Sequence, residues 1–335
     1  MKRLYTLFVF TLLIAILASG CSKDDSKSAN GKGADKVRFG VDTAAGGSFQ
    51  IRAAAAKGYF KNHGIDPQLS NFAYGIDTIN ALLTETTDTG LAADYALLNS
   101  LNRGNLVVLS SLTHGTEETI KQTELLAVKG IDNPDQLKGK KIGVAKGTVS
   151  EYQWAKYLEK IGIDEKEIKY VPFSTPDEAI VGVKKGDIDA VFANGSLVEK
   201  FKSFDGVHKI DDLSTAGITI SSYLVANKKF VESNPKAVEN LLKAIKEGIA
   251  FVKENPDGTA EIAYKELKIK KEDVLRDLKR SNFTLEFTQE DYDHLTEMQQ
   301  WIVDRGLQKE KYDLNEKLYL DPLKKAFPDA VTYKK

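Results

Sequence analysis

Glycine, serine and threonine stand at four places where a strand would turn into a helix, and such turns can bind a small solute. A helix N-terminus presents unpaired backbone N–H groups and a partial positive charge, so it holds a polar or anionic ligand without Lys or Arg. The alternative at each turn is structural, because Gly permits the backbone turn and Ser or Thr caps the helix. The candidate ligand contacts are Gly46, Gly47 and Ser48, then Gly75 and Ile76, then Gly147, Thr148 and Ser150, and lastly Ser174 and Thr175.

Asp94 and Asn194 stand at matching places, each just after a predicted strand. A carboxylate in a cleft would favour a cationic or hydrogen-bond-donating group and repel an anion. We expect both side chains to contact the ligand, and Asp94→Ala to change ligand preference while folding stays intact. The alternative is that Asp94 caps the helix that starts near Tyr95. Apolar walls are usual in small-ligand sites, and the aromatic candidates are Phe49 and Tyr95, followed by Tyr74, Tyr152, Phe173 and Tyr223.

Residues that could carry catalysis are scattered or missing from the sequence. The four His form no pair with the spacing of metal ligands, and no G-x-S-x-G, Walker A or G-x-G-x-x-G sequence occurs. The single cysteine, Cys21, excludes a disulfide framework and a cysteine-rich metal site. We therefore expect no enzyme, cofactor or metal. Arg52 and Lys146 are possible charge partners for a ligand, but we expect both at the solvated surface.

The elements that must position these residues occur twice along the chain. KVRFGV at 36–41, a Gly-rich turn and a helix ending in GYFKNHGI are echoed by KKIGVA at 140–145, a second turn and a helix ending in YLEKIGI. A further stretch at 77–94 is echoed at 177–194. Two similar α/β units predict a cleft with equivalent strand ends facing each other, which is a natural ligand site. The alternative is a chance likeness of two strand–helix–strand segments.

Strands alternate with helices in both halves, which predicts mostly parallel sheets covered by helices. The segments Gln122–Lys129 and Ile218–Asn227 flank the second half, and we interpret them as the two crossings between lobes, hence as the hinge. From Lys228 onward the periodicity is helical, and we expect this part to pack mainly against the first lobe. The predicted strands are 37–42, 67–71, 88–92, 106–111, 141–145, 168–171 and 188–192, and the late helices begin at Pro235 and cover 257–266, 271–282 and 289–304.

The first residues indicate where the protein is located. Lys2 and Arg3 precede an apolar run, 4–18, which is short for a membrane span of about 20 residues. The small residues before Cys21 resemble a bacterial lipoprotein signal, and that resemblance implies that Cys21 becomes the lipid-modified first residue. The alternative is a plain signal peptide with an incidental cysteine. The polar segment that follows is typical of a flexible tether.

Charge and length limit the function further. The chain has 47 basic and 48 acidic residues, so no basic excess suggests nucleic acid as a partner. At 335 residues and 42% hydrophobic content, it can bury a substantial core, which we expect to be split over two lobes. The predicted organisation is a signal peptide at 1–20, a tether at 21–35, lobe 1 at 36–124, lobe 2 at 125–222, and a return to lobe 1 with C-terminal helices at 223–335.

Four stretches carry a family resemblance: AAAAKGYFKNHGIDPQL, DNPDQLKGKKIGVAKGT, VGVKKGDIDAVFANGSLVEKF and YLVANKKFVESNPKAVENLLKAI. The chain resembles the extracytoplasmic solute-binding proteins of ABC importers, in the branch that handles nitrate, sulfonates, taurine and thiamine-pyrimidine precursors. The resemblance spans most of residues 36–250. It implies a two-lobed α/β fold of the periplasmic-binding-protein kind (type II), with hinge strands and a helical C-terminal part.

The same resemblance implies a function. The protein would be a monomeric lipoprotein on the extracytoplasmic face of the cell membrane. It would capture a small polar or anionic solute, sulfonate- or taurine-like or pyrimidine-like, by hinge closure and deliver it to an ABC permease and its ATPase. The alternatives are a receptor that serves a sensor kinase, an enzyme of the thiamine-pyrimidine-precursor kind with the same fold, and an adhesion or structural lipoprotein.

Overall fold

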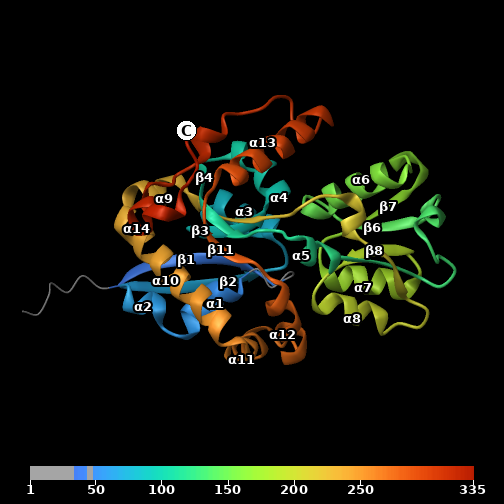
Figure 1. The fold of residues 1–335 in the computed structure, drawn as a ribbon, viewed down its shortest axis with the longest axis horizontal. Coiled ribbons are helices and arrows are strands. Elements are labelled where there is room, and N and C mark those ends of the chain that lie inside the picture. The colour runs from blue at the N-terminus through green and yellow to red at the C-terminus, as the bar shows by residue number, and fades with distance from the viewer. Residues whose placement is uncertain (1–33, 44–47) are drawn as a thin grey trace, which may run out of the picture. The chain divides into compact units, whose positions relative to one another are not determined.

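The computed structural model describes residues 34–43 and 48–335. The predicted signal peptide, Cys21 and nearly all of the tether lie outside the described residues, as do the candidate contacts Gly46 and Gly47. Residues from Ala34 onward form one compact unit by their internal contacts. Within this unit, the strands form two separate sheets (Figure 1). The expectation of an α/β fold with two lobes is confirmed, and we call the parts built on the six-stranded and the five-stranded sheet the first and second lobe.

The first lobe is built on a sheet with the strand order β11-β4-β10-β3-β1-β2. Strand β1 pairs in parallel with β2 and β3, whereas β10 is antiparallel to both β3 and β4. The predicted strands are found here within two residues of their ends. They are β1 (Asp35–Asp42), β2 (Ile65–Phe72), β3 (Thr89–Ala93) and β4 (Leu106–Thr113), joined by β10 (Ser222–Asn227) and β11 (Phe283–Glu286).

The second lobe has the strand order β7-β6-β8-β5-β9. Strand β6 pairs in parallel with β7 and β8, and β5 is antiparallel to β8 and β9. The prediction of mostly parallel sheets is therefore wrong. The strands that follow each crossing between lobes, β5 and β10, enter their sheets in the opposite direction to the strand–helix–strand units. The strands are β5 (Glu124–Ala127), β6 (Lys141–Ala145), β7 (Lys169–Phe173), β8 (Ala190–Ala193) and β9 (His208–Asp212).

The chain passes between the sheets twice. It leaves the first sheet after β4, runs through 114–123 with the short helix α5 (Glu117–Lys121), and enters the second sheet as β5. It leaves the second sheet after β9 and returns through 213–221 to β10. The two segments interpreted as crossings contain β5 and β10, the first strand after each passage.

Helices cover the sheets, and the C-terminal helices lie with the first lobe (Figure 1). The predicted helix at 289–304 is found with the same bounds, whereas the one predicted at 271–282 ends at Arg280. In the first lobe the helices are α1 (Phe49–Ala56), α2 (Tyr59–Asn62), α3 (Gly75–Leu83) and α4 (Asp94–Leu98). In the second they are α6 (Val149–Ile161), α7 (Pro176–Lys185) and α8 (Ser196–Lys202). The C-terminal helices are α9 (Lys228–Ser233), α10 (Pro235–Glu254), α11 (Pro256–Leu267), α12 (Lys271–Arg280), α13 (Gln289–Asp304) and α14 (Asp321–Ala326).

The long helix α10 shows why the C-terminal part belongs to the first lobe. Pro235 opens the helix at a position where its missing N–H costs nothing, and apolar residues follow at helical spacing. Its buried stripe, which includes Leu241 and Ile245, belongs to the same apolar core as β1, β3 and β4. Gly248 lets α10 approach α1 closely, because a Cβ there would lie 2.1 Å from the carbonyl oxygen of Gln50. The second lobe has cores of its own, one of them around Trp154 and Tyr157.

Candidate functional site

A pocket of about 150 Å³ lies between the two lobes. Its first-lobe wall comes from the ends of β1 and β3 and the start of α3, and its second-lobe wall from the ends of β6, β7 and β8 and the starts of α6 and α7. The carboxyl ends of parallel strands are the usual ligand position in α/β folds. The two halves that echo each other in the sequence therefore contribute equivalent ends to one cavity.

Four of the candidate ligand contacts line this pocket. Gly75 lies in the first turn of α3, Thr148 and Ser150 lie at the start of α6, and Asn194 follows β8. Thr148 is 8% exposed. Their convergence from two lobes agrees with a common site, and contact with a ligand stays a prediction for each. Three weaker candidates, Ile76, Tyr74 and Phe173, also belong to the lining.

The other candidates lie elsewhere. Ser48 is fully buried, and its hydroxyl donates to the carbonyl oxygen of Asp42 at 2.9 Å. Phe49 packs in the apolar core of the first lobe. Ser174 is exposed, and its backbone N–H donates to Glu178 Oε2 at 2.7 Å. None of these three residues belongs to the lining of the pocket as the described residues form it.

Asp94 is fully buried and satisfies groups of the first lobe and of the returning chain. Its Oδ1 accepts the N–H of Tyr95 at 2.8 Å, in the first turn of α4. Its Oδ2 accepts the N–H of Ser221 at 3.0 Å and lies 2.8 Å from Nε2 of His294. The carboxylate therefore ties three segments together: the start of α4, the end of the return passage, and α13.

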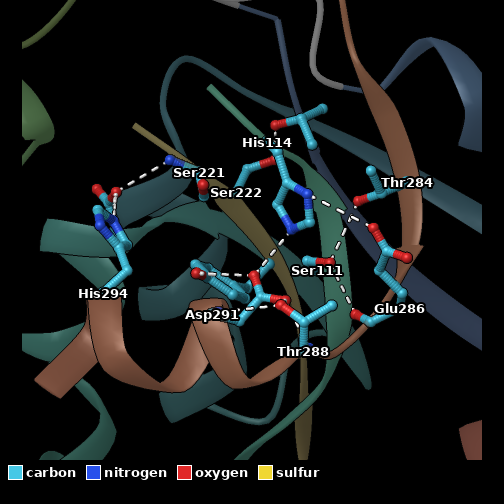
Figure 2. Close-up of polar contacts among 12 residues, drawn as sticks. Ser111, His114, Ser221, Ser222, Thr284, Glu286, Thr288, Asp291 and His294 are labelled. Atoms are coloured by element: carbon cyan, nitrogen blue, oxygen red, sulfur yellow. Dashed lines mark hydrogen bonds and ion pairs between the residues drawn. The ribbon is translucent and has the colours of Figure 1, made fainter. Parts of the chain in front are cut away.

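A second histidine, His114, connects the first passage between the lobes, 114–123, to α13; we call this passage the outward passage and 213–221 the return passage. His114 follows β4, and its Nε2 lies 2.9 Å from Oδ1 of Asp291 on α13 (Figure 2). The same carboxylate accepts the hydroxyl of Tyr223 at 3.3 Å, while Nδ1 of His114 lies 3.5 Å from Glu286. Both passages between the lobes are thus fastened to α13, one through His114 and the other through Asp94 and His294.

The charges of these partners change the titration of both histidines. The hydrogen bond to Asp291 raises the pKa of His114 above its ordinary value, against the opposing effect of burial. Burial also opposes the charged form of His294, but the hydrogen bond and charge of Asp94 outweigh it and raise the pKa of His294. Sequence reasoning missed this network because its partners lie up to 200 residues apart.

Tyr95 contacts the second lobe beside the pocket. Its hydroxyl donates to Glu151 Oε2 of α6 at 3.0 Å, and its ring stacks on Tyr152 with centroids 6.4 Å apart. Trp301 of α13 meets Tyr152 edge-on, with centroids 4.8 Å apart. Burial and the nearby carboxylate of Glu151 raise the pKa of Tyr95. These rings and the hydrogen bond form a direct contact between the lobes.

Three polar residues of the lining were missed in the sequence. Asp42 ends β1, Thr123 ends the outward passage, and Gln153 lies on α6 one turn after Val149. The position of Asp42 was readable, because it closes the first parallel strand at its carboxyl end. Gln153 follows from helical spacing once Val149 is placed at the pocket, since residues four apart share a face.

The expectation that Arg52 lies at the surface is wrong, because its side chain is 2% exposed. Its Nε donates to Ser48 Oγ at 3.0 Å, and its Nη2 donates to Asn71 Oδ1 at 2.8 Å and to the carbonyl oxygen of Asp42 at 3.3 Å. Glu266 of α11 lies 3.2 Å from Nη1. A buried guanidinium is tolerated when its donors are satisfied in this way. Lys146, by contrast, is exposed as expected and pairs with Glu151.

Side chains of the same segments already satisfy backbone N–H groups at the three helix starts that face the pocket. Before α3, Asp77 Oδ2 accepts the N–H of Tyr74 at 3.1 Å. At α6, the hydroxyl of Thr148 accepts the N–H of Ser150 at 3.1 Å. Also at α6, the N–H of Gly147 donates to Glu151 Oε2 at 3.1 Å. At α7, the N–H of Glu178 donates to Thr175 Oγ1 at 3.2 Å. The capping interpretation of Thr148 and Thr175 is therefore confirmed.

Neither a cluster of metal-ligating side chains nor a membrane-spanning helix is found among the described residues. No group of three or more His, Cys, Asp or Glu is placed to hold a metal ion within residues 34–43 and 48–335. None of the helices in that part of the chain is both long and apolar enough to cross a membrane.

Comparison with known proteins identifies the family. The NMT1/THI5-like family matches residues 48–259, which is more than half of the chain, so the chain belongs to this family. A Brucella abortus (strain 2308) protein, provisionally described as a binding protein, is 26% identical over 241 residues, which cover 70% of this chain and 72% of that protein.

Solved structures agree with the fold. The periplasmic aliphatic sulphonate binding protein SsuA from Escherichia coli superimposes with a TM-score of 0.70 at 17% identity, over 84% of this chain and 97% of that one. The desulfurization enzyme DSZB superimposes with a TM-score of 0.65 at 14% identity, over 88% and 99% of the two chains. At these identities the likeness establishes a periplasmic-binding-protein fold, which both a binding protein and an enzyme can have.

Proposed function

We propose that this chain is the solute-binding component of an ABC importer, which holds a small solute in the pocket between its two lobes. The observation that carries the proposal is the pocket itself, because its walls come from equivalent strand ends of two sheets that the chain joins by two passages. Catalysis is not part of the proposal. The relatives named as binding proteins support this choice, although the likeness to a desulfurization enzyme makes turnover worth testing.

Capture would occur by closure of the lobes about the two passages, 114–123 and 213–221. Closure moves the wall that contains Asp42 and Gly75 towards the wall that contains Thr148 and Asn194. Such motion removes the solute from water and presents a changed surface to a partner. The partners that we propose are a membrane permease and its ATPase, and Cys21 is the proposed lipid anchor on the extracytoplasmic side of the cell membrane.

The pocket volume fits a small solute. An engineered protein cavity of about 150 Å³ holds one benzene molecule, and the pocket has a similar volume. A sulfonate- or taurine-like or pyrimidine-like solute would be accommodated once the lobes adjust.

The test is a thermal-shift screen of the purified protein with sulfonates, taurine, nitrate, bicarbonate, pyrimidines, amino acids and amines. A true ligand at a hundred times its Kd adds about 2.7 kcal/mol of stability. Small-angle scattering should then show a more compact particle with the ligand than without it. The absence of stabilisation by any solute in the screen would count against a binding protein. Conversion of a stabilising solute, followed by mass spectrometry, would favour the enzyme alternative.

The transport role needs a separate measurement. Stimulation of the ATPase activity of a permease complex by the liganded protein would support it. Control of kinase autophosphorylation by the liganded protein would instead favour the sensing alternative.

A further inference from the structure

The two lobes also contact each other outside the pocket. The guanidinium of Arg305, which follows α13, forms an ion pair with the carboxylate of Glu165 in the second lobe. This pair and the hydrogen bond from Tyr95 to Glu151 lie at a hollow of about 340 Å³, which is lined by residues of both lobes. We call these residues and the neighbouring ring pair the lobe contact: Tyr95, Trp301 and Arg305 of the first lobe, and Glu151, Tyr152 and Glu165 of the second.

Each side chain of the ion pair is held in place by a neighbour on its own lobe. The Cζ atom of Arg305 lies 4.9 Å from the ring centre of Trp301, and Glu165 Oε2 accepts the hydroxyl of Tyr170 at 2.9 Å. The two paired side chains are 39% and 29% exposed. Exposed ion pairs usually stabilise little, because holding two long side chains in one geometry costs entropy. Here that loss is smaller, since both side chains are already positioned before the lobes meet.

The lobe contact is separate from the pocket but shares a helix with it. None of its six residues belongs to the described lining of the pocket. On α6, however, Ser150 lines the pocket, and the next two residues, Glu151 and Tyr152, belong to the lobe contact. Movement of the second lobe away from the first would therefore break the lobe contact and widen the pocket at the same time.

We propose that the ion pair of Arg305 and Glu165 acts as a latch, which holds the lobes in the arrangement that forms the pocket without touching a solute. Arg305 is then a positioning residue for solute capture. This inference rests on the proposed function, because it concerns closure of the same pocket. The latch raises the fraction of molecules in the binding arrangement, and the apparent affinity for a solute rises in proportion to that fraction.

The experiment reverses the two charges one at a time and then together. Arg305→Glu and Glu165→Lys each replace attraction by repulsion, and the double variant restores an ion pair with the charges exchanged. The lost attraction and the new repulsion add, so each single variant should raise the ratio of open to closed molecules by about twofold to thirtyfold. The double variant should return this ratio close to that of the unaltered protein.

Two measurements on the full chain without solute report this ratio. Small-angle scattering gives the separation of the lobes as the radius of gyration. Acrylamide quenching of tryptophan fluorescence reports the lobe contact, because Trp301 meets Tyr152 of the second lobe, whereas Trp154, the other tryptophan of the chain, is fully buried. Both quantities should increase in the single variants. A residue that only stabilises its own lobe would lower the Tm and leave the radius of gyration unchanged.

Arg103→Glu is the matched control, because it makes the same charge change at an exposed position of the first lobe, ahead of β4. It should leave the radius of gyration and the quenching unchanged. If one of the two single variants fails to fold, the other, which lies on the opposite lobe, gives the same test.

Two outcomes would overturn the inference. In the first, both single variants keep the radius of gyration and the quenching of the unaltered protein. In the second, the double variant is as open as the single variants, so the two residues do not act through each other. Neither outcome bears on the solute screen, which tests the proposed function separately. A screen without any ligand would likewise leave the result of the charge exchange intact.

Discussion

The contact between Asp94 and His294 allows a prediction of stability to be worked through from the structure. Asp94→Ala removes a fully buried carboxylate that accepts two backbone N–H groups and pairs with His294. Removing one partner of a buried pair costs about 3–5 kcal/mol, because the other groups lose their acceptor. At about 2 °C per kcal/mol for a chain of this length, the Tm should fall by about 6–10 °C. Sequence reasoning alone expected intact folding for this variant.

The pH dependence of the stability of Asp94→Ala separates the effect of the His294 charge from the effect of lost packing. The folded-state pKa of His294 is raised, so the pair contributes stability that is fully present below the ordinary pKa of histidine and is lost as the pH rises through the folded-state value. Asp94→Ala should therefore lose more stability at pH 5 than at pH 8. Asp94→Asn keeps the shape of the side chain and one acceptor oxygen, so its stability should lie between that of the unaltered protein and that of Asp94→Ala.

Differential scanning calorimetry at pH 5 and pH 8 gives the measurement. Asp66→Ala, at a partly exposed position on β2, serves as the control and should change the Tm by no more than about 1 °C, the equivalent of about 0.5 kcal/mol. A Tm of Asp94→Ala equal to that of the unaltered protein would refute the reasoning. So would an equal loss at both pH values, which would leave no part for the charged form of His294.

Three further predictions follow from single contacts. His114→Gln should lower the stability more at pH 5 than at pH 8, because the raised pKa of His114 makes the stabilisation by this residue greatest in acid. Calorimetry at the two pH values measures this difference, and a loss of stability that is independent of pH would contradict it. Tyr95→Phe removes the hydrogen bond of 3.0 Å between the lobes and should shift the free energy of lobe closure by about 0.5–1.5 kcal/mol. The shift should be measured as a changed apparent Kd for a ligand while the fold is unchanged. An unchanged Kd would show that the contact is equally strong in the open and the closed state. Gly248→Ala should destabilise the protein by about 1–3 kcal/mol in urea unfolding, because its Cβ would overlap the carbonyl oxygen of Gln50. Alanine has the higher helix propensity, so a stability that is unchanged or increased would contradict this prediction.

The elements could be predicted closely because they depend on short-range patterns. The strand at 141–145 and the helix at 289–304 have the predicted bounds, since a short buried run between two turns and a Thr cap are both local signals. The direction of β5 and β10 was missed, because pairing direction depends on where the chain returns after a passage between lobes. Local pattern contains no information on that return.

The candidate site likewise has residues that local patterns predict and contacts that only long-range pairing decides. The turns at Gly75, Thr148 and Asn194 were found because residue type and repeat position mark the carboxyl end of a strand. Asp94 was placed at a cleft by the same rule, but its carboxylate is used by Ser221 and His294, which lie 127 and 200 residues further along the chain. Competition from such distant donors is invisible in a single sequence.

The sequence by itself determined the α/β class, the duplication that creates two facing walls, and the family to which the resemblance pointed. Each of these depends on periodicity and on short motifs, which are properties of neighbouring residues. Only the tertiary structure decided that Arg52 is buried, that the carboxylate of Asp94 is used by Ser221 and His294, and that Asp42 lines the pocket. Each of these depends on which groups from distant segments of the chain meet in space, and a single sequence does not contain that information.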